Sequence, residues 1–167
     1  MTNESPLIRL ATEDDLESIN TIYNYYVENS TCTYQYQPDT FADRKKWFIE
    51  HGDIHPVTVA ELDGEILGWG ALSPFSSREA YRLTVEDSIY VKNSVRRKGI
   101  GSALLNDLLT RAKTIGHHSV IARIDAEQTQ SIALHAKFGF ENVGRLKEAG
   151  WKFDRWLDVA LMEILIR

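Results

Sequence analysis

The chain contains one cysteine, Cys32, among its 167 residues. One thiol cannot form an internal disulfide, and it cannot supply the several cysteines of a thiolate metal site. His117 and His118 are adjacent rather than spaced along one helix face, and no acidic or cysteine partner stands close to them in the sequence. We therefore expect no metal.

Long apolar runs are also missing. None approaches the length of a membrane-spanning helix, and the segment MTNESPLIRL lacks the basic start and apolar core of a secretory signal. The formal net charge of −5 argues against nucleic acid as the main partner, because that binding depends on neutralising phosphates. We expect a cytoplasmic protein that binds neither a membrane nor nucleic acid.

The chain is long enough for one domain, residues 1–167, and 43% of its residues are hydrophobic. No repeat or linker divides it. The dipeptide Asp63-Gly64 predicts a hairpin between two strands, and Thr12 with Asp15 resembles a capping box that opens a helix. Alternation predicts strands at 7–11, 57–62, 65–72, 85–91, 118–124 and within 156–167, and helical spacing predicts helices at 12–28, 41–50, 99–115 and 129–138. This order predicts a mixed, mostly antiparallel α/β sheet with helices on both faces.

The segment VRRKGIGSALLNDLL places three cations where a helix begins. Cations are unfavourable there, because a helix start carries partial positive charge. Gly99 and Gly101 would allow a ligand to approach the backbone closely, so the segment predicts a site for a phosphate or pyrophosphate. The alternative is a solvated basic loop before an amphipathic helix.

Neither common nucleotide-binding loop occurs. The Gly-x-x-x-x-Gly-Lys-Ser/Thr pattern is absent, and Leu104 stands where Gly-x-Gly-x-x-Gly needs its third glycine. The pattern Arg96-x-x-Gly99-x-Gly101 directly after a strand resembles instead the pyrophosphate loop of the GNAT-type acetyl-CoA-dependent N-acetyltransferases. The order of elements on both sides of the loop is similar to that superfamily as well.

This resemblance implies a splayed strand pair with acetyl-CoA bound in the gap. Backbone groups of Ile89, Tyr90 and Val91 would hold the pantetheine arm. The residues implied to take the pyrophosphate are Arg96, Arg97, Lys98, Gly99, Ile100, Gly101 and Ser102.

Longer segments narrow the resemblance. IRLATEDDLESINTIYNYYVENST, AYRLTVEDSIYV, IALHAKFGF and KFDRWLDVALM together resemble the phosphinothricin and methionine sulfoximine N-acetyltransferases over essentially the whole chain. That family acetylates the α-amino group of small glutamate-like or methionine-like analogues and usually forms homodimers. The resemblance implies the same small-molecule amine substrate and a homodimer here.

Acetyl transfer requires a neutral amine, and an α-amino group has a pKa of about 7.7 to 8.0 at a chain end. Glu86 matches the position of the family's proposed general base, acting directly or through a water. On ideal alternation Glu86 shares a strand face with Ser88 and Tyr90. The alternative for Glu86 is a solvent-facing strand carboxylate.

Gln128, Ser131 and His135 are spaced to lie on one stripe of a helix. The superfamily commonly has asparagine and tyrosine at the first and last of these positions, so this chain departs at Gln128 and His135. His135 is either an acid or base for the reaction, or a packed side chain bonded to a backbone carbonyl; both alternatives stay open.

A substrate carboxylate needs a cation, and Arg78 and Arg82 precede the predicted base. Their alternative is an ordinary surface role. The resemblance adds Tyr34, Ser76 and Val85 to the substrate residues, although Tyr34 also fits a core or interface aromatic. Three aromatic residues close to the C-terminus fit the pocket mouth, an interface or the core: Trp151, Phe153 and Trp156.

The predicted activity is direct attack of the amine on the thioester, without an acyl-enzyme. Two other acceptors are compatible with the same cofactor site, a protein N-terminus and a polyamine. A non-catalytic CoA-binding sensor and a phosphate-binding regulatory domain are the non-enzymatic alternatives, because a fold alone does not establish catalysis.

Overall fold

The structure is a computed structural model that describes residues 5–167. Within those residues one sheet of seven strands has the order β1-β2-β3-β4-β5-β7-β6. Only the β4–β5 pair is parallel, so the predicted mixed, mostly antiparallel sheet is confirmed. The strands are β1 (Leu7–Leu10), β2 (Val57–Leu62), β3 (Glu65–Pro74), β4 (Thr84–Val91), β5 (Ser119–Asp125), β6 (Glu141–Lys152) and β7 (Arg155–Leu165).

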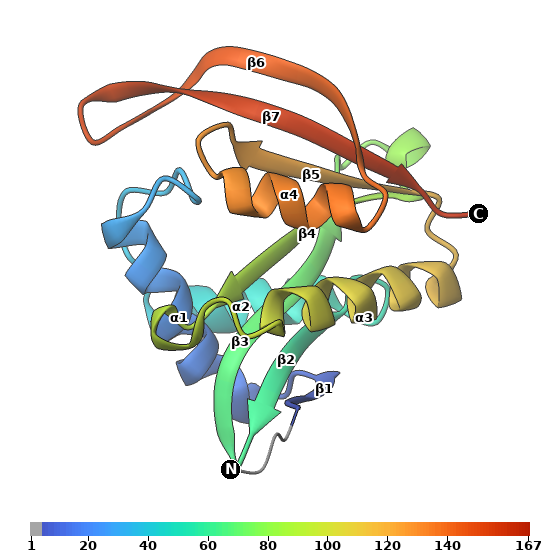
Figure 1. Cartoon of the computed structure of the whole chain (residues 1–167). Coiled ribbons are helices and arrows are strands. Elements are labelled where there is room, and N and C mark those ends of the chain that lie inside the picture. The colour runs from blue at the N-terminus through green and yellow to red at the C-terminus, as the bar shows by residue number, and fades with distance from the viewer. Residues whose placement is uncertain (1–4) are drawn as a thin grey trace.

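The helices cover both faces of the sheet, as predicted (Figure 1). They are α1 (Leu16–Asn29), α2 (Phe41–His51), α3 (Ile100–Ile115) and α4 (Thr129–Lys137). Buried side chains of α1 pack on β2 and β3, with α2 beside them, whereas α3 packs on the opposite face. None of the helices in residues 5–167 has both the length and the apolar character needed to cross a membrane.

Local turn chemistry accounts for several element boundaries. Asp63 and Gly64 both have positive φ, 52° and 80°, as the predicted two-residue hairpin requires. Gly116 ends α3 in the left-handed conformation. The chain before α1 differs from the prediction, because Glu13–Asp15 form a 3-10 turn before the α-helix begins.

Strand β6 was not predicted. Its sequence ENVGRLKEAGWK shows no apolar alternation, because the strand lies at the sheet edge with nearly all of its side chains exposed. Its pairing with β7 is also interrupted at Asn142/Gly144 and at Leu146/Gly150. Periodicity therefore carried no signal for this strand.

The end of the β6–β7 hairpin contacts the segment that follows α1. The Lys152 ammonium donates to the carbonyl oxygens of Ser30 and Thr33, at 2.7 and 2.8 Å, and the Tyr36 hydroxyl donates to the Trp151 carbonyl. The three aromatic residues of the hairpin remain exposed and do not belong to the core: Trp151 at 43%, Phe153 at 53% and Trp156 at 58%.

Replacement of Gly150 by alanine tests this contact. An added Cβ would lie 2.4 Å from Cε2 and 2.6 Å from Cδ2 of Tyr34, inside van der Waals distance. Gly150→Ala should therefore lower the free energy of unfolding by about 1–3 kcal/mol in denaturant titrations. Gly144→Ala in the same strand is the matched control, because its Cβ would meet only Leu161 Cδ1 at 3.7 Å. Equal stability of the two variants would contradict the packing described here.

Candidate active site

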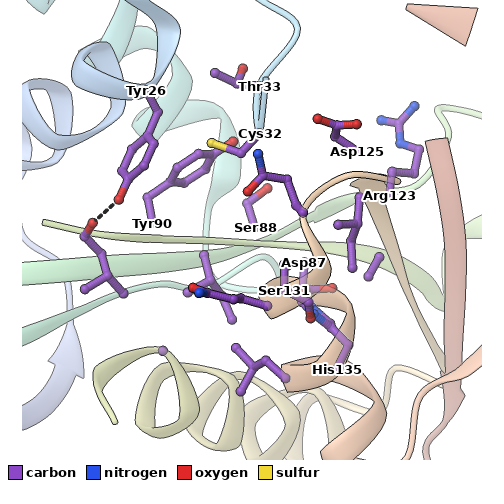
Figure 2. Close-up of a pocket in the computed structure, with 18 of the residues that line it drawn as sticks. Tyr26, Cys32, Thr33, Asp87, Ser88, Tyr90, Arg123, Asp125, Ser131 and His135 are labelled. Carbon is purple, nitrogen blue, oxygen red and sulfur yellow. Dashed lines mark hydrogen bonds and ion pairs between the residues drawn. The ribbon is translucent and has the colours of Figure 1, made fainter. Parts of the chain in front are cut away.

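Strands β4 and β5 separate soon after they meet. Their pairing covers only Thr84–Glu86 against Ser119–Ile121. Beyond this point a cavity of about 650 Å³ opens between them, lined also by the start of α3, by α4 and by the segment after α1. Figure 2 shows Ser88 and Tyr90 of β4 and Arg123 and Asp125 of β5 around this space. The predicted splayed strand pair is confirmed.

The separation leaves backbone groups of β4 without a strand partner on one side. In an antiparallel ladder, successive residues direct their N–H and C=O groups alternately toward the partner strand and away from it. The Val91 carbonyl points away from β3, since it accepts a hydrogen bond from the Tyr26 hydroxyl (Figure 2). The backbone N–H and C=O groups of Ile89, two residues earlier, point in the same direction and therefore face the gap. The backbone of Tyr90 faces Trp69 of β3 instead.

The start of α3 forms the second part of the site. Gly99 has a φ of 80°, and the first helical hydrogen bond runs from the Ala103 N–H to the Gly99 carbonyl at 3.0 Å. The N–H groups of the first helical turn therefore have no carbonyl within the helix. No side chain caps this helix start, and the first turn contains no acidic residue. The N–H groups in question belong to Ile100, Gly101 and Ser102.

Cations surround these free N–H groups. Arg96 and Arg97 line the main cavity and also a neighbouring cavity of about 410 Å³ that extends to the start of α4. Free N–H groups, the positive end of the helix and two guanidinium groups fit a pyrophosphate. Lys98 lines neither cavity.

The two predicted catalytic residues lie on opposite faces of β4. The β3–β4 register runs without interruption from Val85 to Val91, so side chains alternate strictly. Glu86 and Ser88 therefore share a face with Tyr90, whose ring stacks on Trp69 of the α1 side at 4.9 Å. Asp87 points to the α3 and α4 side, where it meets His135.

Glu86 lines the cavity with 17% of its side chain exposed, so it is not a freely solvated carboxylate. Its Oε2 lies 2.6 Å from the guanidinium of Arg123, which reaches across from β5. Arg123 was not predicted as a site residue. Alternation in 118–124 does place it on the same strand face as Asp125, but nothing local indicates its ionic partner.

His135 contacts hydrogen-bond acceptors through both ring nitrogens. Nδ1 lies 2.7 Å from the Ser131 carbonyl oxygen, and Nε2 lies 2.9 Å from Oδ2 of Asp87. A carbonyl and a carboxylate at these two positions favour the doubly protonated imidazolium form of the ring. Burial lowers the pKa of His135, but the hydrogen bond and charge of Asp87 outweigh burial, and the pKa lies above its usual value.

This pair is buried, with 5% of the His135 side chain and 2% of the Asp87 side chain exposed. The His135 ring also packs edge-to-face on Phe140 at 4.9 Å. The geometry thus matches the alternative of a packed histidine bonded to a backbone carbonyl, and it adds an ion pair to Asp87. The second carboxylate oxygen of Asp87, Oδ1, is buried without a partner among residues 5–167, although Asp87 lines the cavity.

Gln128 and Ser131 both line the cavity. The Gln128 amide donates to the Thr31 hydroxyl at 3.3 Å, and that hydroxyl bonds to Asp125. Gln128, which stands where the superfamily commonly has asparagine, therefore links the start of α4 to the segment after α1.

Tyr34 and Cys32 also line the cavity, and burial disfavours the charged form of both. Burial, with the charges of Asp125 and Asp158, raises the pKa of the Tyr34 hydroxyl to about 12. Burial also raises the pKa of the Cys32 thiol, which disfavours the nucleophilic thiolate.

Four predicted substrate residues lie outside the residues that line the cavity. Val85 is completely buried and faces α3, because alternation turns it away from the face of Glu86. Ser76, Arg78 and Arg82 lie in the segment before β4, and the two arginines are exposed on the surface. Their roles stay predictions. Among residues 5–167 no group of three His, Cys, Asp or Glu side chains is arranged to hold a metal.

Comparison with known proteins identifies the family. A family model described as the Acetyltransferase (GNAT) family matches residues 19–140, and the chain belongs to this family. An L-methionine sulfoximine/L-methionine sulfone acetyltransferase from Pseudomonas paraeruginosa is 38% identical over 96% of this chain and 94% of its own length.

Two solved structures extend the likeness. A GNAT superfamily phosphinothricin acetyltransferase from Sinorhizobium meliloti, in complex with acetyl-CoA, is 39% identical with a TM-score of 0.94, covering 98% of this chain and 89% of its own. A ribosomal-protein-alanine N-acetyltransferase from Brucella melitensis is 40% identical with a TM-score of 0.93, covering 95% of this chain and 99% of its own.

The Asp87–His135 pair makes a testable prediction about titration. In an NMR titration the His135 ring should show a pKa above 6.5 in the wild type, and Asp87→Asn should lower it because burial then acts without the carboxylate. The stability that His135 contributes is complete below pH 6.5 and is lost as the pH rises through the folded-state pKa. An unchanged His135 titration in Asp87→Asn would refute the ion pair.

Proposed function

We propose that this protein is an acetyl-CoA-dependent N-acetyltransferase that acetylates the α-amino group of a small amino-acid analogue. One observation carries the proposal. A gap between two parted strands joins an uncapped, cation-flanked helix start at one end to the Glu86 carboxylate at the other.

The residues around the gap fit coenzyme A. Arg96, Arg97 and the first turn of α3 would hold its pyrophosphate, and the backbone groups of Ile89 and Val91 that no strand pairs would face the pantetheine amides. When bound, acetyl-CoA supplies a thioester carbonyl as the electrophile.

Glu86 is the proposed general base. It accepts a proton from the substrate ammonium, directly or through a water, and the neutral amine then attacks the thioester carbonyl. The N–C bond forms, the nitrogen gives up its second proton, the C–S bond breaks, and the departing sulfur receives one proton, so that one proton is released to solvent overall. The site contributes mainly by holding two reactants together in the correct orientation. The protonated Cys32 supports direct transfer rather than an acyl-enzyme.

We propose His135 as the proton donor for the departing sulfur on the family resemblance alone. Its ring lies on the α4 side of β4, with Nδ1 at the Ser131 carbonyl and Nε2 at Asp87. One of these two contacts must break before His135 can donate a proton, so the contacts themselves support a packing role between α4 and β4.

The relatives support a methionine sulfoximine, methionine sulfone or phosphinothricin type of acceptor. A protein N-terminus is the second candidate, because the likeness to the Brucella melitensis structure is of similar strength. We also propose a homodimer, supported by the exposed aromatic residues at the end of the β6–β7 hairpin, since tryptophan is enriched at interfaces.

A thiol-release assay with acetyl-CoA tests the proposal. Methionine sulfone, methionine sulfoximine and phosphinothricin should release coenzyme A, whereas spermidine and an alanine-initiated peptide should not. Calorimetric binding of coenzyme A without thiol release from any amine would instead identify a sensor. Preference for the peptide would establish the protein N-terminus as the acceptor.

Substitution of the base tests the mechanism. Glu86→Gln should lower kcat/KM roughly 10²- to 10⁴-fold at neutral pH. The deficit should shrink at high pH, where more of the substrate amine is already neutral. Coenzyme A affinity, measured by calorimetry, should stay as in the wild type because Glu86 lies away from the pyrophosphate loop. A pH profile parallel to that of the wild type would remove Glu86 from proton transfer.

A further inference from the structure

Arg123 is a cation at the end of the cavity where Glu86 lies. The sequence alone did not predict it as a site residue. Glu86 is opposite Ile121 in the last paired position of β4 and β5, and Arg123 follows two residues later on the same strand face. Its side chain therefore stands where the strands part. Figure 2 shows the Arg123 side chain on the opposite side of the strands from His135.

The guanidinium has unused hydrogen-bonding capacity. It has five N–H donors, and among residues 5–167 its one ionic contact is the 2.6 Å approach to Glu86. The side chain is 58% exposed, and ion pairs with an exposed partner are weak because water screens them. A substrate carboxylate can therefore bind the guanidinium beside Glu86, or in place of Glu86, at a small cost in free energy.

Other cations in the described part of the chain are placed differently. Lys152 is buried and donates to two carbonyl oxygens. Arg96 and Arg97 flank the start of α3, where the pyrophosphate is proposed to bind. Arg78 and Arg82 lie outside the cavity lining. Arg123 is thus the cation that adjoins the proposed base.

We propose that Arg123 binds the α-carboxylate of the acceptor and so makes the enzyme selective for free α-amino acids. This inference rests on the proposed function. An α-amino acid carries its ammonium and carboxylate on either side of one carbon atom, and Glu86 with Arg123 presents the complementary pair of charges. The carboxylate binds the planar guanidinium, which suits two parallel hydrogen bonds, while the ammonium lies against Glu86.

The test compares methionine sulfone with its carboxamide, which keeps the amine but has no carboxylate. Arg123→Gln should raise KM for the free acid roughly 10- to 100-fold, because a charge-assisted contact is lost. The loss in kcat/KM for the carboxamide should be at least about tenfold smaller than the loss for the acid, because the carboxamide has no carboxylate to lose and is affected only through the contact of Arg123 with Glu86. Arg123→Lys should restore part of the affinity for the acid, because lysine keeps the positive charge but lacks the planar guanidinium that can form two parallel hydrogen bonds. Arg111→Gln, a distant arginine paired with Asp107 on α3, is the matched control.

Each other result overturns the inference. If Arg123→Gln lowered kcat/KM equally for the acid and the carboxamide, Arg123 would act only through Glu86. If kcat/KM for the acid alone fell in Arg78→Gln or Arg82→Gln, but not in Arg123→Gln, the substituted arginine would be the residue that binds the carboxylate.

Calorimetry of methionine sulfone binding separates this inference from the proposed function. If the wild type acetylates no amine, the proposed function fails. Methionine sulfone binding that is lost in Arg123→Gln would still support the carboxylate site. Binding that is equal in the two proteins, or absent from the wild type, would overturn it.

Discussion

The short pairing of β4 with β5 is the constraint on which the site depends. The two strands run parallel for three residue pairs and then part, while β4 stays fully paired with β3 on its other side. One edge of β4 is thereby left with backbone donors and acceptors that no strand satisfies. Buried backbone groups need partners, so this edge is suited to an extended polar ligand that runs along the strand.

Because side chains alternate without interruption along β4, successive residues of this strand lie on opposite faces of the sheet. The Glu86 face receives Arg123, Tyr34 and the segment after α1, whereas the Asp87 face receives α4 and His135. The basic loop lies beyond the strand, where α3 begins without a cap. A ligand in the gap would therefore meet a cationic end, a polar backbone edge and the Glu86 carboxylate in sequence, although the chain as a whole is acidic.

Features with a local chemical cause were predictable from the sequence. The turn at Asp63-Gly64, the cap at Gly116 and the basic loop before α3 each follow from a few adjacent residues. Strand β6 was not predictable, because an exposed edge strand carries no apolar period and depends on β7 and the segment after α1. The pairs Glu86–Arg123 and Asp87–His135 also escaped prediction. Each joins elements that only the folded sheet brings together, and the role of Glu86 itself came from family resemblance.

The position of β7 has a consequence for how the protein folds during synthesis. In the sheet order β5-β7-β6, strand β6 is made before β7 but attaches to the sheet only through it. A nascent chain therefore exposes one edge of β5 and an unpaired β6 until β7 has left the ribosome. The contact of Lys152 with Ser30 and Thr33 must wait for the same moment. The segment after α1, which lines the cavity, is thus anchored late, and open strand edges at that stage are the places where non-native pairing would begin.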